Sequence, residues 1–166
     1  SQFTEYNLTI DLTKHEKAEY KSYQDAISKH LPKFGEHGIR GAFLCHRGGK
    51  GKRGRNQSPQ QWASQYAMHM GWTPEMSPNH NIYKLWNPSI IRGYARQVVE
   101  NLKNINDFLY NNGSKYDAAI EILKKFHDKK IMSFGQSTKF ADSLAEEFNK
   151  EKLGLAVVYH TQMKSR

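Results

Sequence analysis

The sequence has few of the residues that support disulfide, zinc or thiol chemistry. It contains one cysteine, Cys45, which excludes an internal disulfide and leaves no CxxC pair for zinc, as expected of a protein in a reducing compartment. His46 follows directly and could activate a thiolate. Because a lone cysteine at the end of an apolar stretch is more often packed in a core, we predict that Cys45 is buried and not catalytic.

Motifs of metal and nucleotide chemistry are also missing. The eight histidines form no HExxH motif and no pairing with cysteine at ligand spacing, so we predict no metal site. No GxxxxGK[ST] sequence occurs, which excludes a self-sufficient P-loop ATPase. Gly49, Gly51 and Gly54 match a dinucleotide-binding spacing, but the variable positions are basic. We therefore predict that this chain alone contains no catalytic residue and binds no cofactor.

Long apolar runs are absent too. No stretch approaches the roughly 20 apolar residues of a membrane-spanning helix, and the start lacks a signal-peptide pattern. We therefore expect a cytoplasmic protein without a membrane partner. The length of 166 residues suffices for one domain with its own core.

Positive charge is what the sequence has in excess. It has 25 Lys and Arg against 16 Asp and Glu, a net charge of +9. The nine residues RGGKGKRGR contain five cations and no acid, which predicts a flexible basic loop. Such a loop often contacts phosphates, because each neutralised phosphate releases condensed counterions. The nucleic-acid-binding residues predicted here are Arg47, Lys50, Lys52, Arg53 and Arg55; the alternative is a solvated loop that touches nothing.

Several aromatic residues follow the basic stretch and could stack on bases. Their spacing, however, is that of a helix, which favours a place in the core. The residues concerned are Trp62, Tyr66, Trp72, Tyr83 and Trp86.

Local patterns predict alternating strands and helices. Strands are expected at 6–12, 130–134 and 154–159, from apolar alternation or short apolar runs. Helices are expected after the caps Thr13 and Ser58, from Pro88 to Asn111, from near Ser114, and after Ser137. Residues 31–86 are expected to be mostly helical and irregular. A strand, turn, helix and strand in this order predict an α/β fold.

The turn Gly135-Gln136-Ser137 is the predicted ligand contact of that α/β arrangement. It lies between an expected strand and an expected helix, where α/β proteins commonly bind ligands. Ser137 would cap the helix, and the free N–H groups of the helix start could meet a phosphate. A role for Ser137 as a cap alone is the alternative.

Three segments in order resemble those of superfamily 2 helicases, the ATP-driven nucleic-acid translocases with two RecA-like domains. DLTKHEKAEY at 11–20 is similar to an "LTxxExxxY" linker, and KIMSFGQSTKFADSLAEEF at 130–148 resembles helicase motif IV. LAVVYHTQMKSR at 155–166 resembles the next strand and its "YHSxMKxR" segment. The resemblance covers roughly half of the chain, and the nearest relatives look like phage and bacterial helicases.

The resemblance implies a partial RecA-like, P-loop-NTPase-like helicase C-terminal domain at 87–166. Residues 1–30 would be its entry linker, and residues 31–86 a basic, aromatic-rich, helical or irregular insertion. The Walker A and acidic motifs and motifs V and VI are missing. The chain thus looks like part of a longer enzyme, either a fragment or one of two polypeptides, in a bacterial cell or a phage-infected host.

The implied function is to grip nucleic acid while a missing RecA-like domain supplies the ATP site. ATP and Mg²⁺ would be bound by the complete enzyme and not by this chain alone. The implied partner is DNA, as a single strand or a duplex junction, with RNA as an alternative. The implied contacts are Gly135, Gln136, Ser137, Lys139, His160, Thr161 and Lys164; for the last three the alternative is a solvated strand end. A stand-alone nucleic-acid-binding or accessory module, or a protein-interaction domain, is the rival hypothesis.

Overall fold

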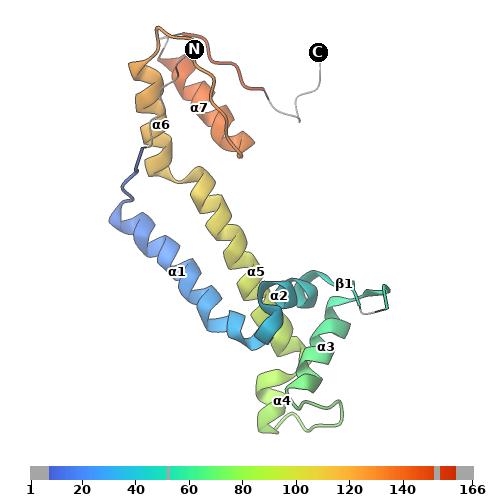
Figure 1. Ribbon diagram of the computed structural model, residues 1–166. Helices are drawn as coiled ribbons and strands as arrows, with labels where there is room; N and C mark the ends of the chain where they lie inside the picture. Colours follow the sequence, from blue (N-terminus) through green and yellow to red (C-terminus); the bar gives the residue numbers. More distant parts are fainter. Residues whose placement is uncertain (1–7, 52, 152–153, 160–166) are drawn as a thin grey trace. The chain divides into compact units, whose positions relative to one another are not determined.

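The computed structural model describes residues 8–51, 53–151 and 154–159 (Figure 1). Their elements in chain order are α1 (Lys14–His30), the 3₁₀ helix η1 (Leu31–His37), α2 (Gly38–Arg47), β1 (Gly49–Lys50), β2 (Asn56–Gln57), α3 (Pro59–His69), α4 (Asn81–Trp86), α5 (Pro88–Asn111), α6 (Gly113–Lys125) and α7 (Thr138–Lys150). In the described part of the chain, no helix has the length and apolar character needed to cross a membrane.

The chain forms two compact units. One comprises residues 20–105 and is called the central unit; the other comprises residues 1–19 and 106–166 and is called the split unit. The split unit contains the start of α1, the end of α5, and α6 and α7, whereas the remaining elements belong to the central unit.

The predicted α/β, RecA-like fold is wrong. The structure is mostly helical, and the only sheet among the described residues consists of the two short strands β1 and β2. Residues 6 and 7 of the first expected strand lie outside the described residues. Residues 8–12, 130–134 and 154–159 are not helical, but they pair with no strand in the described part of the chain. Phe134 is 88% exposed and Tyr159 94%. A strand needs a neighbouring strand for its backbone hydrogen bonds, and the described residues supply none to these segments.

The helix starts predicted from capping residues are confirmed. The Thr13 N–H donates to Glu16 Oε2 at 2.8 Å, and the Glu16 N–H donates back to Thr13 Oγ1 at 3.2 Å. Ser58 and Gln61 form the same reciprocal pair at the start of α3, with distances of 2.8 and 3.2 Å. Such pairs satisfy N–H groups that the first helical turn leaves without a partner.

The two later helices also begin at polar caps. Ser137 Oγ accepts from the Phe140 N–H at 3.1 Å, as predicted. The cap of α6 is Asn112, whose Oδ1 accepts from the Lys115 N–H at 2.8 Å, two residues before the predicted Ser114. Ser114 instead donates its N–H to Glu16 Oε1 at 3.0 Å and its hydroxyl to Glu16 Oε2.

The core of the central unit is built on α5 and the helices packed against it. Its buried residues are Phe34, Ala42, Cys45, Ala63, Ala67, Ile91, Ala95, Val98 and Val99. Trp62, Tyr66, Trp72 and Trp86 pack against this cluster, so the prediction that these four aromatic residues belong to the core is confirmed. The small residues on α2 and α3 let the helices approach closely, because no large side chain separates their backbones.

Cys45 lies within that core, as predicted. Its side chain is fully buried, and burial raises the pKa of the thiol to about 12. The thiolate is therefore disfavoured at neutral pH, which argues against a nucleophilic cysteine at this position.

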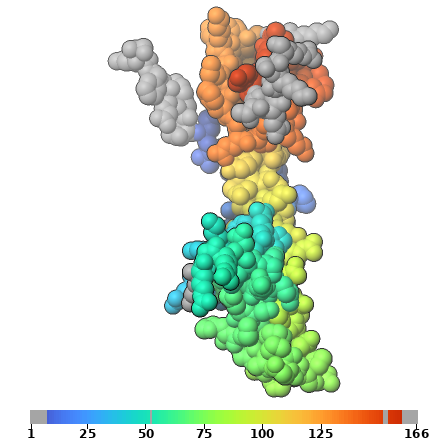
Figure 2. All heavy atoms as spheres, turned by 90° about the vertical axis from the view of Figure 1, so that its right-hand side faces the viewer, coloured from blue at the N-terminus to red at the C-terminus, as the bar shows by residue number. Residues whose placement is uncertain are grey.

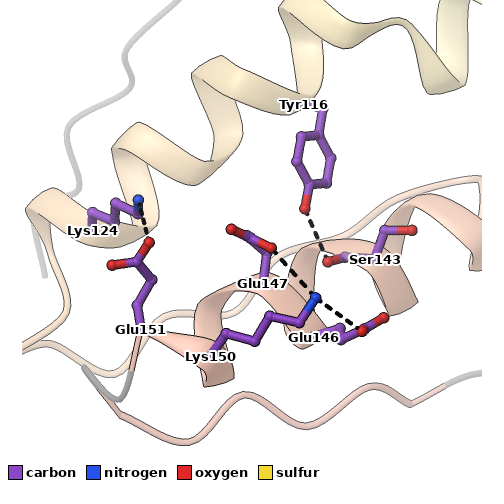
Figure 3. A network of polar contacts seen from close by, with 7 residues as sticks. All are labelled: Tyr116, Lys124, Ser143, Glu146, Glu147, Lys150 and Glu151. Atoms are coloured by element: carbon purple, nitrogen blue, oxygen red, sulfur yellow. Dashed lines mark hydrogen bonds and ion pairs between the residues drawn. The ribbon is translucent and has the colours of Figure 1, made fainter.

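In the split unit, α6 and α7 pack as a helix pair (Figure 3). The Tyr116 hydroxyl donates to the Ser143 carbonyl at 3.0 Å, and Lys124 Nζ lies 3.0 Å from Glu151 Oε1. Exposed ion pairs of this kind typically contribute only about 0–1 kcal/mol. The buried apolar residues of this unit therefore carry most of the packing energy: Phe108, Ile120, Leu144 and Phe148.

Candidate nucleic-acid interface

The basic stretch between α2 and α3 forms a β-hairpin. Gly49 pairs with Gln57 and Lys50 with Asn56 in an antiparallel register. Two further backbone hydrogen bonds close the turn, from the Gly51 N–H to the Arg55 carbonyl at 2.8 Å and from the Gly54 N–H to the Gly51 carbonyl at 2.9 Å. The expected flexible loop therefore has a defined backbone geometry.

The hairpin is attached to the helices at its base. The Trp62 Nε1–H donates to the Gly49 carbonyl at 3.3 Å, and the Gln65 Nε2–H donates to Gln57 Oε1 at 3.1 Å. Gly48 ends α2 with a φ of 79° and a ψ of −175°, and a Cβ there would lie 2.6 Å from the Gln57 carbonyl oxygen. Only glycine fits this close, left-handed connection.

Four of the five predicted cations of this hairpin are described, and all four are exposed: Arg47, Lys50, Arg53 and Arg55. Lys52 lies outside the described residues. Across the part of the chain that the structure describes, none of these four forms an ion pair with a carboxylate. The turquoise hairpin faces the viewer in Figure 2 and is not covered there by other described residues.

Arg47 has one further contact, because its guanidinium lies over the Phe43 ring at 5.4 Å. This stacking restrains the side chain without neutralising its charge. The hairpin therefore presents several positive charges on an anchored backbone, and it can bind an anionic polymer with less loss of conformational entropy than a flexible loop.

The predicted site at the turn before α7 is less developed. Gly135, Gln136 and Lys139 are exposed, while the Ser137 hydroxyl is occupied on both sides. It accepts from the Phe140 N–H and donates to Asn111 Oδ1 at 2.7 Å. This geometry supports the interpretation of Ser137 as a helix cap. His160, Thr161 and Lys164 lie outside the described residues, so the predicted contacts there stay predictions.

The basic hairpin and the turn at 135–137 belong to different units. Sequence reasoning identified the cations but missed the residues that hold them, above all Trp62 and Gln65. A local signal was present, since Gly48 and the Ser58-Pro59 helix start closely frame the basic stretch. Short segments between a helix end and a helix cap favour a tight connection over a free loop.

In the described ranges, no group of three or more His, Cys, Asp or Glu side chains could hold a metal ion. No protein-family model, no curated protein and no solved structure matches this chain. A function must therefore be inferred from the physical properties of the site itself.

Proposed function

We propose that this chain binds nucleic acid through the basic hairpin at 47–57, by contacts to the phosphate backbone. The observation that supports this most directly is the set of four exposed cations that have no carboxylate partner among the described residues. Contacts of this kind carry no base information, so binding should be independent of sequence.

The wider electrostatics support the same function. The central unit contains 13 Lys and Arg against four Asp and Glu, so all of the net charge of +9 belongs to it. Every neutralised phosphate releases counterions, which makes affinity fall with salt at a slope of about −0.9 per contact on duplex DNA. DNA is the partner we propose, as a single strand or a duplex junction, with RNA as the alternative.

Charge reversal in the hairpin tests this function. We expect the triple variant K50E/R53E/R55E to lose about 100-fold in affinity for a labelled oligonucleotide, since each phosphate contact contributes roughly 1 kcal/mol. Fluorescence anisotropy on single-stranded and duplex oligonucleotides, over a series of salt concentrations, measures both the affinity and its salt slope.

A matched control separates local from overall charge. The variant K84E/K103E/K130E changes the net charge equally at three exposed lysines outside the hairpin. It should lose much less affinity than the hairpin variant. Equal losses in both variants, or unchanged binding by the hairpin variant, would contradict a backbone-binding role for the hairpin.

We also propose a narrower role, as the nucleic-acid-gripping part of an ATP-dependent superfamily 2 helicase or translocase in the cytoplasm of a bacterial or phage-infected cell. The three segments at 11–20, 130–148 and 155–166 support it by their resemblance, although no α/β fold accompanies them. The ATP and Mg²⁺ site would belong to the rest of that enzyme.

This role predicts that the purified 166-residue chain hydrolyses no ATP, with or without DNA. A phosphate-release assay measures ATP hydrolysis, and measurable turnover would contradict the assignment of the ATP site to another part of the enzyme. The coding sequence on either side is the second test. A GxxxxGK[ST] motif upstream and a QxxGRxxR-like motif downstream would support the helicase assignment, whereas unrelated flanking sequence would favour a stand-alone binding module.

A further inference from the structure

A pocket of about 450 Å³ lies between α2 and α5 in the central unit. Cys45 and His46 line it from α2. The residues from α5 are spaced by three, four, seven and eleven positions from the first, so they share one face of the helix; they are Ser89, Arg92, Gly93, Arg96 and Glu100. None of the predicted site residues belongs to this pocket.

The charges in the pocket are not fully compensated. Arg96 Nε lies 2.7 Å from Glu100 Oε1, so that arginine is held by an acid one turn away. Arg92 forms no ion pair within the described part of the chain. A guanidinium presents several N–H donors in a fork that fits the oxygens of a phosphate. The end of the pocket at Ser89 and Arg92 is therefore suited to a single anionic group, while Glu100 disfavours a larger polyanion at the other end.

The first backbone N–H groups of α5 are not available to bind an anion in this pocket. Pro88 has no N–H, and the N–H groups of Ser89 and Ile90 already donate to Asn87 Oδ1, at 3.0 and 3.1 Å. An anion would therefore be recognised by side chains, namely the Arg92 guanidinium, the Ser89 hydroxyl and the His46 ring.

Gly93 is an exposed residue that borders the same pocket. A glycine inside a helix destabilises it by about 1 kcal/mol relative to alanine. Packing does not require glycine here, because a Cβ at Gly93 would meet no atom within 4 Å. The backbone does not require it either, because Gly93 is not among the glycines with a positive φ. The residue lines the pocket, so the missing side chain leaves open the space beside Arg92 that a ligand would occupy.

The pocket and the hairpin are connected through α2. His46 lines the pocket, and Lys50 on β1 is four residues further along the chain. Four residues span at most about 14 Å, which corresponds to about four nucleotide steps of 3.4 Å along one strand. One short stretch of a nucleic-acid strand can therefore reach both features.

We propose that this pocket binds one backbone phosphate of the same nucleic-acid strand that lies on the hairpin. The inference rests on the proposed nucleic-acid-binding function and adds a second, concave contact to it. In this arrangement the hairpin supplies general attraction, and the pocket places one phosphodiester at a defined point on the central unit.

Two variants of the full chain test the pocket. Arg92→Gln removes the charge and keeps a good helix former, so it should lower oligonucleotide affinity about tenfold and reduce the magnitude of the salt slope by about 0.9. Gly93→Leu places a side chain in the open space; it should weaken binding by a similar factor while raising the melting temperature, because leucine favours a helix. Lys103→Gln, at an exposed lysine on the same helix and outside the pocket, is the control and should bind nearly as the wild type.

The outcomes separate the two proposals. Weaker binding by Arg92→Gln and Gly93→Leu, together with normal binding by Lys103→Gln, is the expected result. If the hairpin variant K50E/R53E/R55E loses affinity while both pocket variants bind like the wild type, the pocket proposal is overturned and the proposed function stands. If the hairpin variant itself binds normally, the proposed function fails first.

Discussion

The two units of this protein differ sharply in charge. The central unit carries 13 Lys and Arg against four Asp and Glu, whereas the split unit has 12 of each. The net positive charge of the chain is therefore located on residues 20–105. Both units contain ion pairs: Lys21–Asp25 and Arg96–Glu100 lie in the central unit, and Lys124 and Lys150 pair with glutamates on α7 or just after it in the split unit.

The central unit also has the larger buried core. The central unit has a cluster of nine buried residues, while the described part of the split unit buries four apolar side chains. A larger core can hold a strained, charged feature such as the Gly48 connection in place, because many contacts resist its relaxation. We therefore assign the proposed nucleic-acid binding to the central unit.

The largest expected effect comes from removing a core ring in either unit. Phe34→Ala in the central unit and Phe148→Ala in the split unit should each cost about 3–5 kcal/mol, since both rings are buried. All three tryptophans, Trp62, Trp72 and Trp86, belong to the central unit. Urea unfolding followed by tryptophan fluorescence should therefore shift strongly for Phe34→Ala.

The same measurement should change little for Phe148→Ala, whose effect should be seen by far-UV circular dichroism. A large shift of the tryptophan transition in Phe148→Ala would show that the two units unfold together. The two units would then not differ in stability as separate parts of the chain.

A smaller effect is expected at the base of the hairpin. Gly48→Ala forces an L-residue into a conformation that is nearly restricted to glycine, at a cost of about 1–3 kcal/mol, and its Cβ would clash with the Gln57 carbonyl at 2.6 Å. Gly54→Ala also has a positive φ, of 70°, but its Cβ meets no atom within 4 Å.

Anisotropy should therefore show weaker oligonucleotide binding for Gly48→Ala than for Gly54→Ala. Both variants keep all of the cations, so the difference measures the contribution of hairpin geometry alone. Identical oligonucleotide affinities of the two variants would mean that the positive charges suffice for binding and that the backbone geometry of the hairpin does not contribute.

The smallest effect concerns pH and the split unit. The Ser114 hydroxyl and N–H, together with the Thr13 N–H, stabilise the charged form of Glu16 and lower its pKa to about 2. A carboxylate with a lowered pKa in the folded state stabilises the fold above about pH 4.5, and this contribution is lost as the pH falls from about 4.5 to about 2.

Glu16→Gln should remove that part of the pH dependence. Circular dichroism of the variant should show a flatter loss of stability in this acidic range than the wild type, while the tryptophan signal of the central unit responds identically in both. A steeper acid transition in the variant would contradict the assigned role of Glu16.

Features that depend on near neighbours in the sequence were predicted well. Thr13 with Glu16 and Ser58 with Gln61 satisfy N–H groups within one turn, so the sequence alone located these helix starts. Pro88 and Asn111 bound α5 as expected. These positions are determined by hydrogen bonds and backbone preferences over three or four residues.

The strands and the binding pocket could not be predicted in the same way. Ile131 and Val157 lie in apolar runs with the composition of strands, but the structure leaves both side chains exposed and gives their segments no partner in the described chain. The pocket is lined by His46 from α2 and by Arg92 from α5, two residues that are far apart in the sequence. No local pattern relates two such residues.

The sequence by itself determined the starts of α1, α3, α5 and α7, the excess of positive charge and the burial expected of Cys45, since each follows from local chemistry or composition. Only the tertiary structure decided that the chain is helical rather than α/β, that the basic stretch is an anchored hairpin, and that Arg92 faces a pocket beside α2. The physical reason is that pairing, anchoring and pocket formation all require contacts between segments that are distant in the sequence, and the free energy of those contacts is set by packing.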